Sequence, residues 1–262
     1  MTSILFLGTG AADWDIKNDI YRDDFRAPSG ILIDGHIMVD CGQGAVIYSE
    51  KHKNSDIFKN VDTIFLTHSH SDHFAPECVS KICRQTCRNF TVYGDKIFEK
   101  LLPNEENLKF FPLDAKFYDS AVCGNYRVTA LKSNHATVFP EEQTLHYFFE
   151  GEKNIFIGYD GGWLEAHTWE FLLKKHIDVY IADSTCGNSR ECLYNFRNFS
   201  HNNSYMLDLI YETCIQNKVL DSSSKFILTH FAKTLHPSKA ETEAAAKQKN
   251  YIAAYDGFKI SL

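Results

Sequence analysis

The sequence predicts an α/β protein that forms a single domain over residues 1–262. Short apolar runs rich in β-branched and aromatic residues recur along the chain, and segments of helical character lie between them. The alternation has no solenoid period, and no linker-like segment interrupts it. A length of 262 residues with 44% hydrophobic residues is enough for a substantial core.

The N-terminal part is expected to contain a strand and a hairpin. Residues 4–7 form an apolar run that ends in Gly8-Thr9-Gly10, which predicts a tight turn because a dinucleotide-binding fingerprint needs a third glycine and a helix. The Asp34-Gly35 pair separates two apolar runs, and this pair is a strong hairpin signal. We therefore expect paired strands at 30–35 and 36–40.

The remaining elements are assigned by periodicity and by turn residues. Strands are expected at 61–67, 90–93, 109–113, 126–131, 145–150, 154–158, 179–182, 226–229 and 258–260. Helices are expected after Gly42 and at 76–87, 163–176, 205–216 and 239–249. The helix at 76–87 has proline at its start, where the missing amide hydrogen costs little.

Metal-binding residue types follow the strand predicted at 61–67. The loop Thr67-His68-Ser69-His70-Ser71-Asp72-His73 places three imidazoles and one carboxylate within six positions. On an irregular loop, His68 and His70 can face one ion while Asp72 and His73 face a second one. Neutral imidazole and carboxylate oxygen suit zinc, manganese or iron(II). The loop predicts a metal site for two ions; the alternative is a polar loop in which histidines cluster by chance.

Isolated metal-binding residue types follow other predicted strands: His135, Asp160 and His230. If these strand ends lie on one edge of the sheets, the side chains converge in one cleft. Each of them alone is more often a surface or capping residue. Asp40 and Asp183 also end apolar runs, and they either hold ligand histidines from behind or cap a loop.

Composition excludes some classes of function. The formal net charge of −7 counts against nucleic-acid binding as the main activity. Eight cysteines without a regular framework, and an N-terminus without a basic and apolar leader, favour reduced thiols in the cytoplasm. Cys83 and Cys87 are expected to be packed thiols on one helix. No apolar stretch approaches the roughly 20 residues that span a bilayer, so no membrane association is expected.

The chain resembles the metallo-β-lactamase superfamily over nearly its whole length. Its His-x-His-x-Asp-His signature is matched in full by His68, His70, Asp72 and His73, and the further stations of that superfamily follow in order at Asp40, His135, Asp160 and His230. The segments Phe199-Ser200-His201-Asn202-Asn203 and Thr229-His230-Phe231-Ala232 are similar to the PhnP-type phosphodiesterases.

This resemblance implies a four-layer αββα sandwich with two divalent metal ions. It implies one ion on His68, His70 and His135, a second ion on Asp72, His73 and His230, and Asp160 as the bridging ligand. It also implies His201 as a catalytic histidine, for which a solvated residue beside a helix cap is the alternative. Residues 11–29 contain no cysteine, so the structural zinc of the PhnP type is expected to be absent.

The expected function is that of a metal-dependent hydrolase, in the first place a phosphodiesterase for a small diester, cyclic and nucleotide-like diesters included. A hydroxide between two ions of zinc or manganese, or of iron, would attack phosphorus. Asp72 would orient that hydroxide and His201 would protonate the leaving group. His236 and Arg26 are candidates for substrate contacts.

The alternatives are a lactone or thioester hydrolase on the same two ions and a non-catalytic metal-binding or sensor protein. A monomer and a homodimer are both compatible with the sequence.

Overall fold

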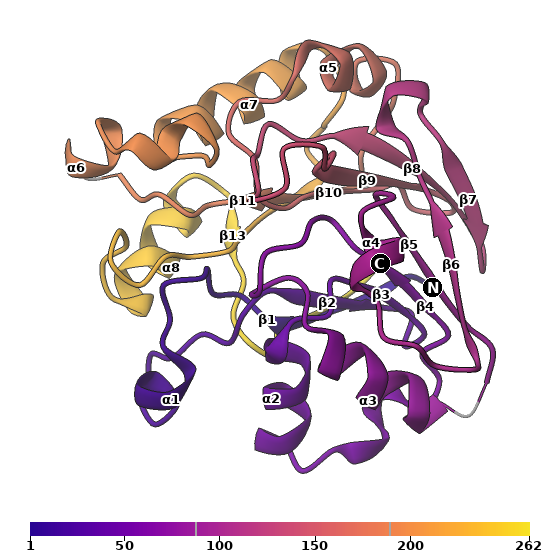
Figure 1. Ribbon diagram of the computed structural model, residues 1–262. Helices are drawn as coiled ribbons and strands as arrows, with labels where there is room; N and C mark the ends of the chain where they lie inside the picture. Colours follow the sequence, from indigo (N-terminus) through magenta and orange to yellow (C-terminus); the bar gives the residue numbers. More distant parts are fainter. Residues whose placement is uncertain (87, 189) are drawn as a thin grey trace.

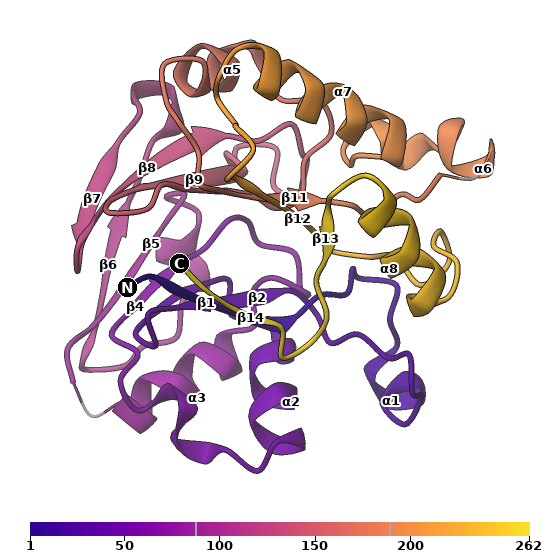
Figure 2. The ribbon, with the colours of Figure 1, turned by 180° about the vertical axis from the view of Figure 1, so that it is seen from behind.

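Two β-sheets pack face to face between outer layers of helices in the computed structural model (Figure 1). The structure describes residues 1–86, 88–188 and 190–262. Helices α2 (Gln43–Lys51) and α3 (Pro76–Thr86) cover the outer face of the first sheet, and α5 (Ala166–Leu172) and α7 (Ser204–Gln216) cover that of the second (Figure 2). The predicted α/β class and the αββα sandwich are confirmed.

The first sheet has the strand order β14 (Lys259–Ser261), β1 (Ser3–Gly8), β2 (Gly30–Ile33), β3 (Ile37–Val39), β4 (Thr63–Phe65), β5 (Phe90–Gly94), β6 (Leu108–Pro112). The second has the order β13 (Ile252–Ala253), β12 (Lys225–Thr229), β11 (Val179–Asp183), β10 (Ile155–Gly158), β9 (Leu145–Glu150), β8 (Tyr126–Lys132), β7 (Ser120–Cys123). The other helices are α1 (Ile16–Asp19), α4 (Phe98–Leu101), α6 (Arg190–Leu193) and α8 (Lys239–Gln248), with 3-10 turns at Ser55–Phe58, Ala115–Phe117 and Phe196–Phe199.

The largest core lies between the two sheets. Phe6 and Phe65 of the first sheet pack in one buried cluster with Tyr147 and Ile157 of the second. Each fully buried side chain of this kind contributes about 1.5–3 kcal/mol relative to an exposed one. Separate apolar clusters lie between each sheet and its helices. The strands therefore form a rigid base for the loops that leave their ends.

The hairpin at Asp34-Gly35 is confirmed, because β2 and β3 are antiparallel and both turn residues have positive φ angles of 50° and 73°. The helix predicted at 76–87 ends at Thr86, and Cys87 lies outside the described residues, so the expected arrangement of Cys83 and Cys87 on one helix is described for Cys83 alone, which is buried.

Two predictions of elements need correction. The helix expected at 163–176 is limited to Ala166–Leu172, because the preceding backbone crosses to another loop, where the amide of Gly162 donates to the carbonyl of Asn134. Strand β7 was not predicted. It is a short edge strand of alternating exposed and buried residues that pairs with β8 through a two-residue turn.

Several strands end on the same edge of the sandwich. Strands β3 and β4 are parallel to each other in the first sheet, and β8, β10, β11 and β12 run in one direction in the second. The chain turns abruptly beyond three of these strands, because Asp40, Asp160 and His230 have φ angles of 63°, 20° and 60°, which residues with a Cβ rarely adopt. These strained turns are at the positions where the sequence predicts functional side chains.

Gly42 allows the first of these turns to approach the histidine-rich loop. A Cβ atom on Gly42 would lie 2.2 Å from the carbonyl oxygen of Asp72, and the neighbouring Cys41 donates its amide hydrogen to the carbonyl of His73. None of the helices in the described ranges is long and apolar enough to cross a membrane.

Candidate metal centre

The residues that follow these strand ends meet in one cluster. Four lie on the loop after β4, and the others follow β8, β10 and β12: His68, His70, Asp72, His73, His135, Asp160, His230. They form two groups that share Asp160. The first ligand group is His68, His70 and His135 with Asp160, and the second ligand group is Asp72, His73 and His230 with Asp160. The structure thus brings together the seven residues predicted as ligands.

The first ligand group has the spacing of ligands around one ion. Nδ1 of His70 lies 3.0 Å from Nε2 of His68 and 3.1 Å from Nε2 of His135. Oδ2 of Asp160 lies 3.5 Å and 3.7 Å from these two Nε2 atoms. Four ligands about 2.1 Å from a tetrahedral ion are about 3.4 Å apart, so this group can hold a metal ion of zinc size.

The second ligand group has the same spacing and contains one more carboxylate. Nε2 of His73 lies 3.1 Å from Nε2 of His230, and Oδ2 of Asp72 lies 3.4 Å and 3.3 Å from these two nitrogens. Oδ1 of Asp160 lies 3.2 Å from His73 and 3.0 Å from His230. Asp160 therefore directs one carboxylate oxygen to each group.

Oδ1 of Asp160 also lacks an ordinary partner. It is buried, and within the described part of the chain it accepts no hydrogen bond of acceptable geometry. Burial of an ionised oxygen without a hydrogen bond is costly, and native structures seldom tolerate it. A cation beside His73 and His230 would satisfy this oxygen, so the donor set fits divalent metal binding.

Buried polar groups hold the ligand histidines from behind. Oδ2 of Asp40 lies 2.7 Å from Nδ1 of His73, and Asp40 also accepts hydrogen bonds from the amide and the hydroxyl of Thr67. Such contacts fix the orientation of a ligand imidazole and make it more basic. Asp40 thus occupies the supporting position expected for it.

Asp183 acts on the second ligand group through a hydroxyl group. Thr185 donates its hydroxyl hydrogen to Asp183, and the same hydroxyl oxygen lies 2.7 Å from Nδ1 of His230. Nδ1 of His201 lies 2.8 Å from the other Asp183 oxygen. Asp183 is therefore a buried carboxylate that contacts His201 directly and His230 through the Thr185 hydroxyl.

Buried carboxylates determine the charge of the cluster. Burial alone would lower the pKa of His230, but the Asp160 carboxylate outweighs this effect and raises that pKa to about 10. Burial would raise the pKa of Asp160, yet His230 and His73 hold it well below its usual range. Burial dominates at His68 and lowers the pKa of its imidazole well below the usual value. The carboxylates thus require positive charge beside them, which protons or metal cations can supply.

His201 lies against both ligand groups. Its ring stacks on that of His230 with centroids 5.7 Å apart and meets the edge of His135 at 4.9 Å. Its side chain is only 13% exposed, so it is not a solvated residue beside a helix cap. Asn203 is the residue that caps α7. Burial lowers the pKa of His201, but the Asp183 carboxylate outweighs burial and raises that pKa above its usual value.

A cleft of about 330 Å³ opens above the cluster. Its lining includes His70, Asp72, Asp160, His201 and His230, together with Asp13, Thr185 and Arg197. Sequence reasoning missed the last three residues. A signal existed only for Arg197, a cation four positions before the predicted His201, on the 3-10 turn Phe196–Phe199.

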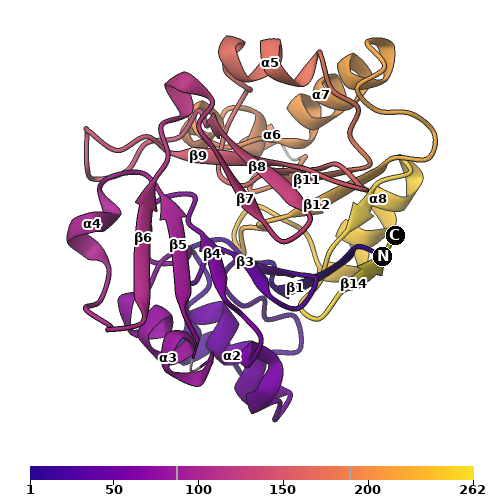
Figure 3. The ribbon, with the colours of Figure 1, turned by 90° about the vertical axis from the view of Figure 1, so that its right-hand side faces the viewer.

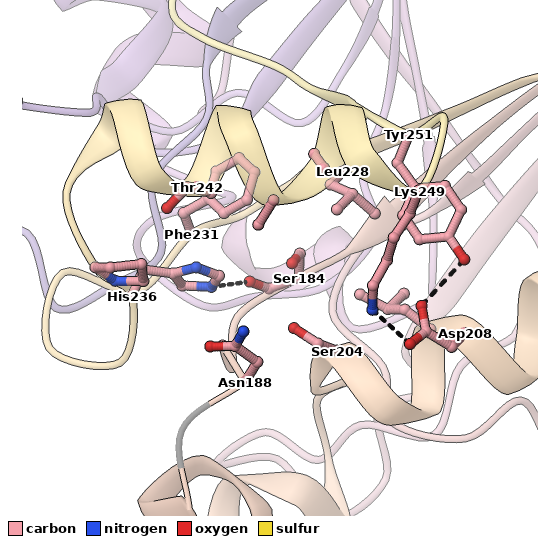
Figure 4. A pocket seen from close by; sticks show the side chains of 15 residues that line it. Ser184, Asn188, Ser204, Asp208, Leu228, Phe231, His236, Thr242, Lys249 and Tyr251 are labelled. Carbon is pink, nitrogen blue, oxygen red and sulfur yellow. Dashed lines mark hydrogen bonds and ion pairs between the residues drawn. The ribbon is translucent and has the colours of Figure 1, made fainter.

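Arg26 and His236 lie in neighbouring pockets instead of the cleft. Arg26 is buried, donates from Nη1 to the Thr9 hydroxyl and the Ala254 carbonyl, and lies 4.3 Å from the centre of the Phe231 ring. His236 borders a pocket between α7 and α8, where its Nε2 lies 2.6 Å from the carbonyl oxygen of Ser184 (Figure 4). These positions do not support the substrate contacts expected for Arg26 and His236.

No family model and no curated protein matches the chain. Solved structures are similar to it. YhfI from Bacillus subtilis, described as a metallo-β-lactamase fold protein, superposes with a TM-score of 0.72 at 15% identity, over 99% of this chain and 98% of that one. A diphosphatase from the PhnP family gives a TM-score of 0.71 at 15% identity, over 100% and 98% of the two chains. The short form of human tRNase Z gives a TM-score of 0.67 at 18% identity, over 99% and 98%. These likenesses, together with the two helix-covered sheets, show that this chain has the metallo-β-lactamase fold.

Proposed function

We propose that the protein is a metal-dependent phosphodiesterase that hydrolyses a small phosphodiester. The observation that carries the proposal is the position of Asp160, which directs one oxygen to each of two complete ligand groups. Two ions on a shared carboxylate would supply a nucleophile from water at neutral pH and would neutralise charge on a phosphoryl group. The similarity in fold to a PhnP-family diphosphatase supports the same class of reaction.

In this proposal, the first ligand group holds one ion and the second ligand group holds the other. Imidazole nitrogens and carboxylate oxygens favour zinc or manganese, and iron(II) also suits them. Asp72 has a second role, because its carboxylate lines the cleft and can accept a hydrogen bond from the attacking water. Asp40 and the Thr185–Asp183 pair keep the ligand imidazoles in the tautomers that bind metal.

His201 and Arg197 would act on the substrate itself. The hydrogen bond from Nδ1 of His201 to Asp183 orients the ring and favours its protonated form, so Nε2 can deliver a proton to the leaving oxygen. Arg197 lines the same cleft and offers a planar cation suited to phosphoryl oxygens. The Arg197 cation in the cleft favours an anionic phosphodiester over an uncharged lactone or thioester.

The test compares four substrates after metal removal and restoration with manganese or zinc: bis(p-nitrophenyl) phosphate, p-nitrophenyl phosphate, a lactone, and a short RNA oligonucleotide. Asp72→Ala serves as the blank. Metal-dependent turnover of the diester that is absent in the blank supports the proposal. Turnover of the lactone alone would reassign the protein to carboxyl-ester hydrolysis. Turnover of RNA alone would place it with the nucleases, a class represented among the similar structures by a tRNase Z.

A further inference from the structure

A second cluster of metal-binding residue types lies on the edge of the sandwich opposite the candidate metal centre. His36 precedes β3 and Asp62 precedes β4, whereas the candidate metal centre lies beyond the other ends of these two strands. Cys123 ends β7 and pairs with Tyr126 at the start of β8, whose far end leads to His135. Figure 3 shows β7 and β8 above β3 and β4. The cluster therefore joins the two sheets.

The three side chains are close enough to share one ion. One ring nitrogen of His36, a carboxylate oxygen of Asp62 and Sγ of Cys123 all lie within 4.8 Å of one another. Nδ1 of His36 lies 3.4 Å from Oδ1 of Asp62, which is the separation of about 3.4 Å expected for two ligands on a tetrahedral zinc ion. A sulfur ligand sits at about 2.3 Å from zinc, so closure around an ion needs a movement of Sγ on the order of 1 Å.

Packing already holds these ligands in place. A Cβ atom on Gly124 would lie 3.0 Å from Cε1 of His36, so the β7–β8 turn closes directly on the imidazole. The Thr63 hydroxyl donates to Oδ1 of Asp62 at 2.9 Å and accepts a hydrogen bond from the Cys123 thiol at 3.3 Å. Thr63 thus holds Asp62 and Cys123 close together, and metal binding would replace the hydrogen bond from the thiol.

We propose that His36, Asp62 and Cys123 form a second metal site, which binds a zinc-class divalent cation and ties the β7–β8 turn to the edge of the first sheet. Imidazole, carboxylate and thiolate are the three ligand types that zinc takes in proteins, and three protein ligands leave a position for water. Binding releases the proton of the Cys123 thiol, because the thiolate is the ligand. The His36 and Asp62 side chains are 29% and 40% exposed, so an ion can enter from solvent.

Cobalt(II) tests this proposal, because a cobalt ion bound to thiolate has a charge-transfer band in the near ultraviolet. The ligands of the candidate metal centre are histidines and aspartates, so this band does not depend on the proposed hydrolase function. We expect titration of the metal-free protein to produce a band whose final intensity corresponds to one thiolate-bound cobalt per chain, both in the wild type and in Asp160→Ala. Excess zinc should abolish the band.

The variants identify the ligands. Cys123→Ser should remove the band, whereas Cys214→Ser, at a buried cysteine on α7, should keep it. His36→Gln should weaken cobalt binding more than about tenfold, and His52→Gln, at an exposed histidine at the end of α2, should leave it unchanged. A wild type without the band, a band that persists in Cys123→Ser, or full affinity in His36→Gln would overturn the proposal. Because His36 is partly exposed, the His36→Gln variant should fold, and its cobalt affinity still tests the proposal if Cys123→Ser does not fold.

Discussion

The second ligand group is buried in all four of its members, whereas His70 of the first is partly exposed; the side chain of His135 is only 4% exposed. The two groups also differ in charge. The second contains two carboxylates and the first contains one, the shared Asp160. The groups that contact Nδ1 of the ligand histidines also differ in charge. Asp40 lies behind His73, but a backbone carbonyl lies 3.0 Å from Nδ1 of His135. The second ligand group would therefore hold a metal ion more tightly than the first.

One loop can thus supply ligands to two sites that differ in burial and in charge. His70 and His73 are three residues apart, yet the first lies at the cleft and the second is completely buried beside Asp40. Burial excludes water and strengthens the attraction between carboxylates and a cation. An ion in the first ligand group would exchange more readily and would face the substrate more openly.

The largest effect is expected for Asp160→Ala, which removes the residue that the two groups share. Because each group loses one ligand, bound metal, compared in the His36→Gln background so that the site proposed on His36, Asp62 and Cys123 does not contribute, should fall from about two ions per chain to well under one. Diester turnover should fall by more than about 10³-fold, since the charge stabilisation supplied by metal ions is worth several kcal/mol. Elemental analysis and initial rates measure the two effects.

Asp56→Ala is the matched control for that experiment, because Asp56 is a highly exposed aspartate remote from the cluster. It should retain the metal and the activity of the wild type. If Asp160→Ala kept two ions per chain, the two groups would be independent sites and the shared carboxylate would have no bridging role.

His201→Ala should separate chemistry from metal binding. The ring contacts one histidine from each ligand group but belongs to neither, so metal content should stay at the wild-type value. Loss of a general acid should lower the turnover of bis(p-nitrophenyl) phosphate by about 10² to 10⁴-fold. His176→Ala changes a histidine that is 42% exposed and should leave the rate unchanged. A decrease of less than threefold in His201→Ala would rule out the proton-donor role.

Asp40→Asn should weaken one half of the cluster selectively. Asp40 contacts His73 at 2.7 Å and supports no histidine of the first ligand group directly. Loss of such a supporting carboxylate lowers metal affinity by about 10 to 100-fold. Asp40 reaches Nδ1 of His68 only through the Thr67 hydroxyl, at 3.0 Å, so competition with a fluorescent chelator should show a larger loss of affinity for the ion of the second ligand group than for the other ion. Equal weakening of both ions would contradict the unequal-site account.

The smallest expected effect concerns the order of metal loss. A chelator should withdraw two ions in two phases, with rates that differ about tenfold or more, because the first ligand group is nearer to the solvent and carries less negative charge. The fast phase should vanish in His70→Ala, and the slow phase should vanish in His73→Ala. A single phase in the wild type, or the reverse assignment in the variants, would show that burial does not control exchange.

The histidine-rich loop was predictable because its residues are contiguous and follow a clear apolar run. His135, Asp160 and His230 were predictable because each follows a strand, and parallel strands deliver such residues to one edge. The division of the seven residues into two ligand groups depends on side-chain distances of about 3 to 4 Å, which strand periodicity does not determine.

The rest of the cleft depends on loops. Arg197 and Asp13 come from irregular segments whose path is set by tertiary contacts, such as the hydrogen bonds from the Lys233 and Thr234 amides to Asp13. Arg26 was predicted to contact the substrate and does not line the cleft. Its position in a polar segment favoured a phosphate contact, but its guanidinium group lies over the Phe231 ring. Local sequence carried no signal for the positions of the Asp13 and Arg26 side chains.

The most direct test of the central claim is a stepwise titration of the metal-free His36→Gln variant, in which the site proposed on His36, Asp62 and Cys123 is weakened. The metal is manganese or zinc, and bound metal per chain and turnover of bis(p-nitrophenyl) phosphate are measured on the same samples. The account predicts that the first equivalent fills the second ligand group with little turnover, and that turnover rises as the second equivalent binds. Full turnover at one equivalent, or no turnover with two ions bound, would contradict it.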